Sequence, residues 1–339
     1  MQKPNRNQDV IEKMNEFGKS QTPFLFIVDF EMEAPTVIPL YDLDSQEVLY
    51  AMNDNFISYQ NFNTKAYQDL PKLEIVKTPI AFSTFKSAFD EVLSNLKKGN
   101  SFLTNLTAET KITSNWPLEA LFHRCKSKYK LFLKDKFICF SPETFVQIRE
   151  SGKISSFPMK GTINAEIEGA EELILADAKE KYEHTTIVDL IRNDISRVAH
   201  KVWVERFRYI ERIKKEDGLE LLQVSSEVCG ELGDSWRERV GEIVFKLLPA
   251  GSISGAPKPK TLEIIKEAEK ATFKSGKRGY YTGVFGVFDG EKLDSAVMIR
   301  FIEQTSKGLV FKSGGGITSR SKAENEYEEL LSKIYVPIL

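Results

Sequence analysis

The chain has 339 residues, of which 41% are hydrophobic and 28% charged, a composition typical of a soluble globular protein with a large core. Lys and Arg number 47 against 49 Asp and Glu, so no overall charge attracts nucleic acid or an anionic membrane. Any charged ligand must therefore be held locally. The polar start of the chain and the lack of a run of about eighteen apolar residues predict a cytoplasmic protein.

The three cysteines, Cys125, Cys139 and Cys229, are far apart and odd in number. This spacing favours neither a disulfide framework nor a paired-cysteine metal site. We interpret them as small buried apolar residues.

The first half of the chain alternates strand-like and helical segments. FLFIVDFE, at 24–31, indicates an early strand. A helix is predicted over 82–98, where phenylalanines and leucines recur at helical spacing before a Gly-Asn stop. Three strand-like runs follow, with Ser-Pro and Ser-Gly turns between them, at 101–110, 136–150 and 153–162. A long helix is then predicted over about 168–192.

The second half repeats this mixture. Helices are predicted over 236–250, 259–270 and 322–335. Between the last two, a strand meander is predicted over 280–316, with hairpin turns at Asp289-Gly290 and Lys307-Gly308. Strands grouped in hairpins, with helices between the groups, favour an α+β fold with mainly antiparallel sheets in a single compact unit.

Acidic residues interrupt the apolar stripe of the helix predicted over 168–192. The stripe is formed by Leu173, Ala176, Ile187 and Ile191, and Glu180 and Glu183 lie in its middle. Because burying an unpaired carboxylate is costly, a cation, a metal ion or a protonated state must compensate. The alternative is a helix rotated so that both acids reach solvent.

The last helix carries a similar pair. Glu326, Glu329 and Lys333 line up on one face, next to an apolar stripe that contains Leu330. Two helices that each present a Glu-x-x-Glu pair could face a shared hard cation, and carboxylate oxygens suit Mg²⁺.

Two glycine-rich loops and one lysine add to this pattern. The segments 249–260 and 312–318 let backbone N–H groups approach an anion, without matching a nucleotide-binding fingerprint. Lys160 lies between a strand-like run and a Gly-Thr turn. It is either a solvated surface charge or a desolvated amine that attacks an electrophile.

Together these segments resemble the chorismate-utilising enzymes from about residue 80 to the end of the chain. The resemblance is carried, in the order of that family, by GNSFLTNLT, SPETF, PMKGT, EKYEHTTIVDLIRNDISRV, LPAGSISGAPKPKTLEII, RGYYTGVFG, MIRF, GGGIT and ENEYEELLSK. It implies that family's fold, with large antiparallel sheets packed together and helices outside. It also implies a short N-terminal region, 1–80, packed onto a catalytic domain, 81–339.

PMKGT is most similar to the aminodeoxychorismate synthase branch, which makes the precursor of 4-aminobenzoate for folate. Anthranilate synthases usually have alanine where this chain has Lys160. The resemblance implies that the Lys160 amine attacks C2 of chorismate and expels the 4-hydroxyl, after which ammonia adds at C4 and expels the lysine. Glu143 in SPETF matches the general acid that protonates the departing hydroxyl.

The remaining roles are also implied by the resemblance. Glu183 and Glu329 match Mg²⁺ ligands, and Glu180 and Glu326 match the second acid of each pair. The positions that match groups around the substrate are Thr162, Tyr281, Arg300, Gly314, Gly315, Gly316 and Lys333. The family pattern differs at Leu103 and Gln223, and no acid–base role is assigned to either.

Two other functions stay open. Anthranilate synthase component I uses the same pocket but adds ammonia at C2, the carbon that Lys160 would occupy. A non-catalytic chorismate-binding subunit is the alternative of another class. Because the chain contains no GxCxG nucleophile segment, a separate glutaminase subunit is implied as the source of ammonia.

Several single residues have purely structural alternatives. Asn105 and Thr107 could satisfy backbone groups at a strand end, and His184 could be a packed core histidine. Asp189 and Arg192 could form an ion pair on a helix surface.

Overall fold

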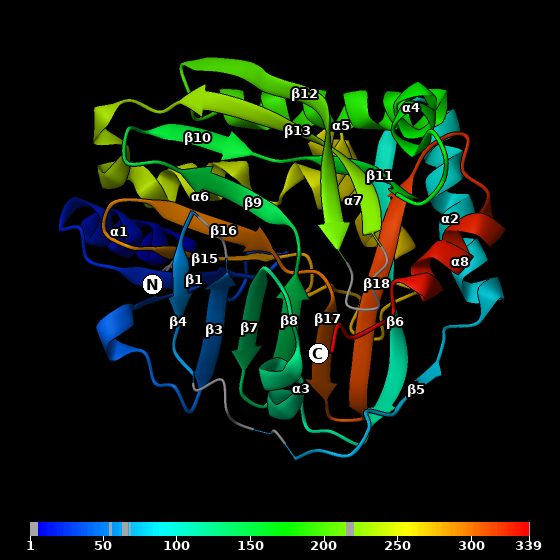
Figure 1. Ribbon diagram of the computed structural model, residues 1–339, viewed down its shortest axis with the longest axis horizontal. Coiled ribbons are helices and arrows are strands. Elements are labelled where there is room, and N and C mark those ends of the chain that lie inside the picture. The colour runs from blue at the N-terminus through cyan, green and yellow to red at the C-terminus, as the bar shows by residue number, and fades with distance from the viewer. Residues whose placement is uncertain (1–5, 54–55, 63–66, 68, 215–219, 339) are drawn as a thin grey trace, which may run out of the picture.

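The structure is a computed structural model that describes residues 6–338 except 54–55, 63–66, 68 and 215–219 (Figure 1). The described residues form eight α-helices and two nine-stranded sheets, and the paired strands within both sheets are antiparallel. The predicted α+β fold, with antiparallel sheets in a single compact chain, is therefore confirmed.

The first sheet crosses the upper part of Figure 1 and has the order β11-β13-β10-β9-β16-β15-β1-β2, with β12 paired to β13. Its strands are β1 (Phe24–Val28), β2 (Thr36–Pro39), β9 (Thr144–Ile148), β10 (Lys153–Ser156), β11 (Met159–Asn164), β12 (Lys201–Lys214), β13 (Glu220–Glu231), β15 (Val284–Phe288) and β16 (Leu293–Val297). Side chains alternate along β1: Phe24 and Phe26 join the core beneath the helices, whereas Leu25 and Ile27 join the core shared with the second sheet.

The second sheet has the order β14-β6-β18-β17-β8-β7-β3-β4, with β5 paired to β6. Its strands are β3 (Val48–Asn53), β4 (Ser58–Gln60), β5 (Ile75–Thr78), β6 (Leu103–Ser114), β7 (Tyr129–Leu133), β8 (Phe137–Ser141), β14 (Gly255–Ala256), β17 (Phe301–Thr305) and β18 (Gly308–Ile317). The two sheets share a hydrophobic core that includes Tyr50, Phe137 and Phe285.

The helices cover the outer faces of both sheets. They are α1 (Arg6–Lys19), α2 (Phe82–Lys97), α3 (Leu118–Arg124), α4 (Ala170–Ala176), α5 (Ala178–Ser196), α6 (Val240–Leu247), α7 (Lys258–Ala268) and α8 (Ala323–Ser332). α5 packs on β11, β12 and β13, whereas α2, α7 and α8 pack around β6 and β18 (Figure 1). None of the described helices is long and apolar enough to cross a membrane.

The helix predicted over 168–192 is in fact two helices. Asp177 ends α4 and caps α5, where its carboxylate accepts a hydrogen bond from the backbone N–H of Glu180. This break shifts the helical phase, so Leu173 is 54% exposed, while Ile187 and Ile191 are buried. The apolar stripe was therefore predicted correctly only within α5. The helix predicted over 82–98 is confirmed as α2.

The meander predicted over 280–316 is wrong at its centre. β15 pairs with β16, and β17 pairs with β18, as the two hairpin turns predicted. However, β16 belongs to the first sheet and β17 to the second, so the chain changes sheet between residues 298 and 300. Arg300, at this change of sheet, has a φ of 53°.

The region before residue 80 contributes to both sheets. β1 and β2 extend the first sheet, and β3, β4 and β5 belong to the second. The domain boundary at residue 80 stays a prediction. Cys125, Cys139 and Cys229 are all free and buried, which confirms their interpretation as small apolar residues.

Candidate active site

A cavity of about 320 Å³ opens where the β11–β13 edge of the first sheet meets the β6–β18 edge of the second. Residues from both sheets line it, together with residues of α5, α8 and the loop before α7. Most of the site residues predicted from the sequence line this one cavity: Glu143, Lys160, Thr162, Tyr281, Arg300, Gly314, Gly315, Gly316, Glu329 and Lys333.

Lys160 extends from β11 into the cavity, and its side chain is 28% exposed. Its Nζ lies 3.4 Å from Oε2 of Glu183, which is only 8% exposed. A Cβ placed on Gly316 would lie 3.6 Å from the same Nζ. The amine is therefore held between α5 and the glycine strand β18, with the small residue leaving room beside it.

Glu143 lies in the turn between β8 and β9 and lines the same cavity. Burial raises the pKa of this carboxyl group above its ordinary value. A hydrogen bond from the Ser252 hydroxyl, 2.5 Å from Oε1, and the charges of Arg300, Lys333 and Lys160 oppose that rise. A raised pKa favours the protonated form, which a general acid needs.

The glycine run of β18 forms another wall of the cavity. Nζ of Lys333 donates a hydrogen bond of 2.8 Å to the carbonyl of Gly314 and lies 2.7 Å from Oε1 of Glu329. A Cβ on Gly315 would lie 3.2 Å from Oε1 of Glu329 and 3.8 Å from Oε2 of Glu326. Both carboxylates of α8 therefore reach this strand, and the absence of a side chain at Gly315 lets them do so.

The carboxylates of α5 lie beside β11, close to Gly161 and Lys160, but neither Glu180 nor Glu183 lines the cavity. Oε2 of Glu180 would be 3.2 Å from a Cβ on Gly161, which has a φ of +81°. Across the described ranges, no group of three or more His, Cys, Asp or Glu side chains is close enough together to hold a metal ion. Magnesium needs only one or two carboxylates when water and a ligand complete its coordination shell. The carboxylates of α5 and α8 are therefore still of the ligand type that Mg²⁺ binds.

Arg300 and Tyr281 also contribute polar groups to the cavity. Nε of Arg300 is buried and makes no hydrogen bond, and its guanidinium lies 5.2 Å from the centre of the Tyr335 ring. Burial raises the pKa of Tyr281 well above its usual value, so its hydroxyl stays protonated. Thr162 lines the cavity from β11, but its side chain is largely exposed.

The structure adds cavity residues that the sequence analysis did not assign to the site. Ser252 belongs to the glycine-rich loop at 249–260, and its hydroxyl, rather than a row of backbone N–H groups, is the contact made there with Glu143. Asn105 lines the cavity with a buried Oδ1 that has no partner. Lys312, almost fully buried, also lines it and pairs with Glu303 at 2.7 Å. Leu103 and Gln223 lie in the wall as well.

Two of the structural alternatives, those for His184 and for Asp189 with Arg192, describe what is seen. His184 is buried against Ser226, with 2.6 Å between Nε2 and Oγ, and burial lowers its pKa to about 4. Asp189 and Arg192 form an ion pair of 3.1 Å on the exposed face of α5. Thr107 bonds to Glu269 rather than to the cavity.

A profile for the family described as chorismate binding enzyme matches residues 17–338. A Haemophilus influenzae protein named an uncharacterized PabA-like protein is 50% identical over 331 residues, covering 98% of this chain and 97% of that protein. Aminodeoxychorismate synthase component 1 of Bacillus subtilis is 30% identical, covering 76% of this chain and 55% of that protein.

Two further comparisons concern proteins with other names. Anthranilate synthase component 1 of Aquifex aeolicus is 36% identical, covering 58% of this chain and 39% of that protein. A solved structure of a menaquinone-specific isochorismate synthase from Escherichia coli matches with a TM-score of 0.69 at 15% identity, covering 98% of this chain and 81% of that one. This last likeness shows a shared fold.

Proposed function

This chain belongs to the family of chorismate binding enzymes, and from that premise we propose that it is a synthase that aminates chorismate at C4. The product is 4-amino-4-deoxychorismate, which leads to 4-aminobenzoate and folate. The observation that carries the proposal is the position of Lys160, whose amine lies in the same cavity as Glu143. An amine and a raised-pKa carboxyl group in one cavity are the nucleophile and general acid that this amination needs.

The reaction has two displacements. In the first, the neutral Lys160 amine forms a bond to C2, the ring double bond shifts, and the C4–O bond breaks. Glu143 supplies the proton with which the hydroxyl leaves as water. In the second, ammonia forms a bond to C4, the double bond shifts back, and the bond from C2 to Lys160 breaks, so that the lysine leaves as a neutral amine. The ammonium formed at C4 then returns a proton to the Glu143 carboxylate. The sum is chorismate plus ammonia giving 4-amino-4-deoxychorismate plus water.

Substrate carboxylates have several candidate partners in the cavity. The Arg300 guanidinium has a buried N–H without a protein acceptor, and a planar fork of this kind suits a carboxylate. The backbone of β18 at 314–316 and the ammonium of Lys333 line the same cavity. Glu183 and Glu329, with Glu180 and Glu326 as the second acid of each pair, would hold Mg²⁺, which supplies positive charge for a substrate carboxylate when it is bound.

Ammonia comes from a separate glutaminase subunit in this proposal. The chain itself offers no segment with the pattern of a glutaminase nucleophile. The purified chain is therefore expected to use an ammonium salt directly and to use glutamine only after a glutaminase is added. Product formed from glutamine by the chain alone would contradict this part of the proposal.

Product identification tests the proposed reaction. The purified chain is incubated with chorismate, Mg²⁺ and an ammonium salt, and the product is separated and characterised by mass and NMR spectroscopy. We expect 4-amino-4-deoxychorismate. Anthranilate would show that ammonia adds at C2, and chorismate that binds but does not react would show a binding subunit.

A further inference from the structure

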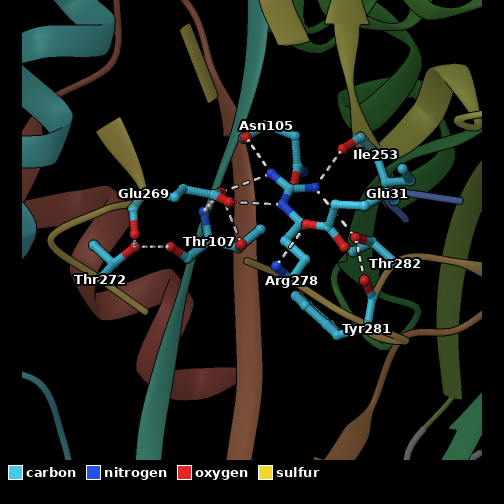
Figure 2. Close-up of polar contacts among 9 residues, drawn as sticks. All are labelled: Glu31, Asn105, Thr107, Ile253, Glu269, Thr272, Arg278, Tyr281 and Thr282. Carbon is cyan, nitrogen blue, oxygen red and sulfur yellow. Dashed lines mark hydrogen bonds and ion pairs between the residues drawn. The ribbon is translucent and has the colours of Figure 1, made fainter. Parts of the chain in front are cut away.

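A buried ion pair lies directly behind the cavity wall. Arg278 is 1% exposed and Glu269 is 3% exposed, and neither lines the cavity. Nε and Nη2 of Arg278 donate to the two carboxylate oxygens of Glu269 at 2.8 and 2.7 Å (Figure 2). This is a two-pronged contact in which the planar guanidinium matches the carboxylate.

The remaining N–H groups of the Arg278 guanidinium donate hydrogen bonds to residues that line the cavity. Nη2 donates to the carbonyl of Asn105 at 2.8 Å, and Nη1 donates to the carbonyl of Ile253 at 2.8 Å and to the hydroxyl of Thr282 at 3.3 Å (Figure 2). Together with the contacts to Glu269, these bonds use all five N–H donors of the side chain. One guanidinium thus connects three wall segments that are far apart in the sequence.

Each of these segments also carries a polar side chain that lines the cavity. Asn105 lies in β6 and presents its unpartnered Oδ1 in the cavity wall. Ile253 follows Ser252, whose hydroxyl bonds to Glu143. Thr282 follows Tyr281 and has a φ of 61°, a conformation that a β-branched residue adopts only when its surroundings impose it.

Glu269 fixes the same network from the other side. Its Oε1 accepts hydrogen bonds of 2.8 Å from both the backbone N–H and the hydroxyl of Thr107, two residues after Asn105 (Figure 2). The hydroxyl of Thr272 donates to the carbonyl of Thr107 at 2.8 Å. Thr107 of β6 is therefore hydrogen-bonded to two residues of the segment after α7, Glu269 and Thr272.

We propose that Arg278 and Glu269 are positioning residues, which fix Asn105, the Ser252 loop and the Tyr281–Thr282 turn relative to one another around the substrate. The inference rests on the proposed function, because it takes the cavity as the site of the reaction. Positioning at this level matters because a shift of about 1 Å in a reacting group can lower a rate about a hundredfold.

The test is a double variant, Arg278→Met with Glu269→Gln. It removes both buried charges together, because removing one alone leaves an unpaired charge that destabilises the fold. Gln keeps an oxygen for the Thr107 amide, whereas the carbonyls of Asn105 and Ile253 lose their donor. We expect kcat with chorismate and ammonium to fall about a hundredfold, with KM for chorismate changed only a few-fold.

A conservative variant separates positioning from charge balance. Arg278→Lys keeps a cation beside Glu269, but an ammonium cannot reproduce the five donors of a planar guanidinium. If the pair only balances charge, this variant has the kcat of the wild type. If it positions the wall, kcat falls by at least about tenfold.

The matched control is Lys130→Met. Lys130 is also a buried cation, it donates to the backbone carbonyls of Phe122 and Cys125, and it does not line the cavity. We expect a lower unfolding temperature and an unchanged kcat at an assay temperature where all variants are folded. A folded double variant with the kcat of the wild type would overturn the inference. So would a loss of kcat in Lys130→Met equal to that in the double variant.

The wild type, run in parallel, separates this inference from the proposed function. If the wild type forms product and the variants do too, only the positioning role fails. If the wild type neither binds nor converts chorismate, the proposed function fails and the positioning role falls with it.

Discussion

Two parts of the cavity are built in different ways. The fixed wall, formed by Asn105, Ile253 and Thr282, is held by neutral acceptors that all bond to one buried guanidinium. The charged rim consists of Lys160, Glu183, Glu329 and Lys333. Lys160 pairs with the buried Glu183 at 3.4 Å, and Lys333 pairs with Glu329 at 2.7 Å, where both side chains are partly exposed. In the fixed wall, every N–H donor of Arg278 is already used. In the charged rim, each ion pair joins a lysine, proposed as nucleophile or substrate-binding residue, to a glutamate proposed as a metal ligand.

This difference teaches which groups are free to change partners. A buried, fully hydrogen-bonded network is expensive to disturb, and it therefore keeps its geometry during a reaction. The Lys333–Glu329 pair is partly exposed and therefore weak, and the 3.4 Å contact of Lys160 with Glu183 is longer than a charge-assisted hydrogen bond, so the members of both pairs can exchange one another for substrate or metal. We infer that the charged rim takes part in the reaction and that the fixed wall keeps the geometry of the cavity. Variants of the two parts test this division, from the largest expected effect to the smallest.

The largest effect is expected at Lys160. Lys160→Ala should lower ammonium-dependent product formation at least about a thousandfold, because it removes the proposed nucleophile. Lys160→Arg should lose as much, since arginine stays protonated and cannot attack. Initial rates at saturating ammonium measure both. Full activity in the two variants would return Lys160 to a purely electrostatic role.

Glu143→Gln should have the next largest effect. The amide cannot give a proton to the departing hydroxyl, so kcat should fall about 10²- to 10⁴-fold while KM for chorismate changes little. Ser252→Ala, which removes only the hydrogen bond to Glu143, should cost much less. Equal losses in Glu143→Gln and Ser252→Ala would argue against a proton transfer from Glu143.

Magnesium dependence should respond to the acids of the rim. Glu183→Gln or Glu329→Gln should raise the Mg²⁺ concentration needed for half-maximal activity roughly tenfold, because each removes a charged oxygen. Glu328→Gln, on an exposed position of α8, is the matched control and should leave that concentration unchanged. Unchanged turnover of the wild type in excess chelator would exclude the proposed metal site.

The smallest effect concerns stability and pH. Because the pKa of Glu143 is raised in the folded state, its carboxyl group stabilises the fold at low pH, and this contribution is lost as pH rises through the folded pKa. Glu143→Gln does not titrate, so its free energy of unfolding should rise relative to the wild type over that window. The gain is about 1.4 kcal/mol for each unit by which the pKa is raised. Denaturant unfolding at several pH values measures it, and a constant difference would show that the pKa is not raised.

Periodicity predicted most elements of the fold but not how the chain distributes them. The strands of 280–316 were found with both hairpin turns, yet the change of sheet before Arg300 was missed. A change of sheet depends on long-range packing. The positive φ at Arg300 marks the change locally, but non-glycine residues rarely adopt a positive φ, so the sequence does not predict it there. The break at Asp177 had a local signal, because Asp is a common helix cap, but the surrounding helical pattern concealed it.

The candidate site divides in the same way. Lys160 and Glu143, whose proposed roles depend on their own chemistry, were found through the likeness of PMKGT and SPETF to segments of the family, and the structure brings both into one cavity. Arg278 and Glu269 do not stand out, since a charged residue nine positions from another is usually a surface residue. Only the three-dimensional contacts show that they are buried together behind the wall.

The central claim, a covalent bond between Lys160 and the substrate, has a direct test. Wild-type protein is mixed with chorismate and Mg²⁺ without ammonia, quenched rapidly and digested, and the peptide that contains PMKGT is weighed by mass spectrometry, with Lys160→Ala as the control. We expect a fraction of the wild-type peptide to gain the mass of chorismate minus water, and the variant peptide to gain nothing. The same gain on another peptide, in both the wild type and the variant, would contradict the claim.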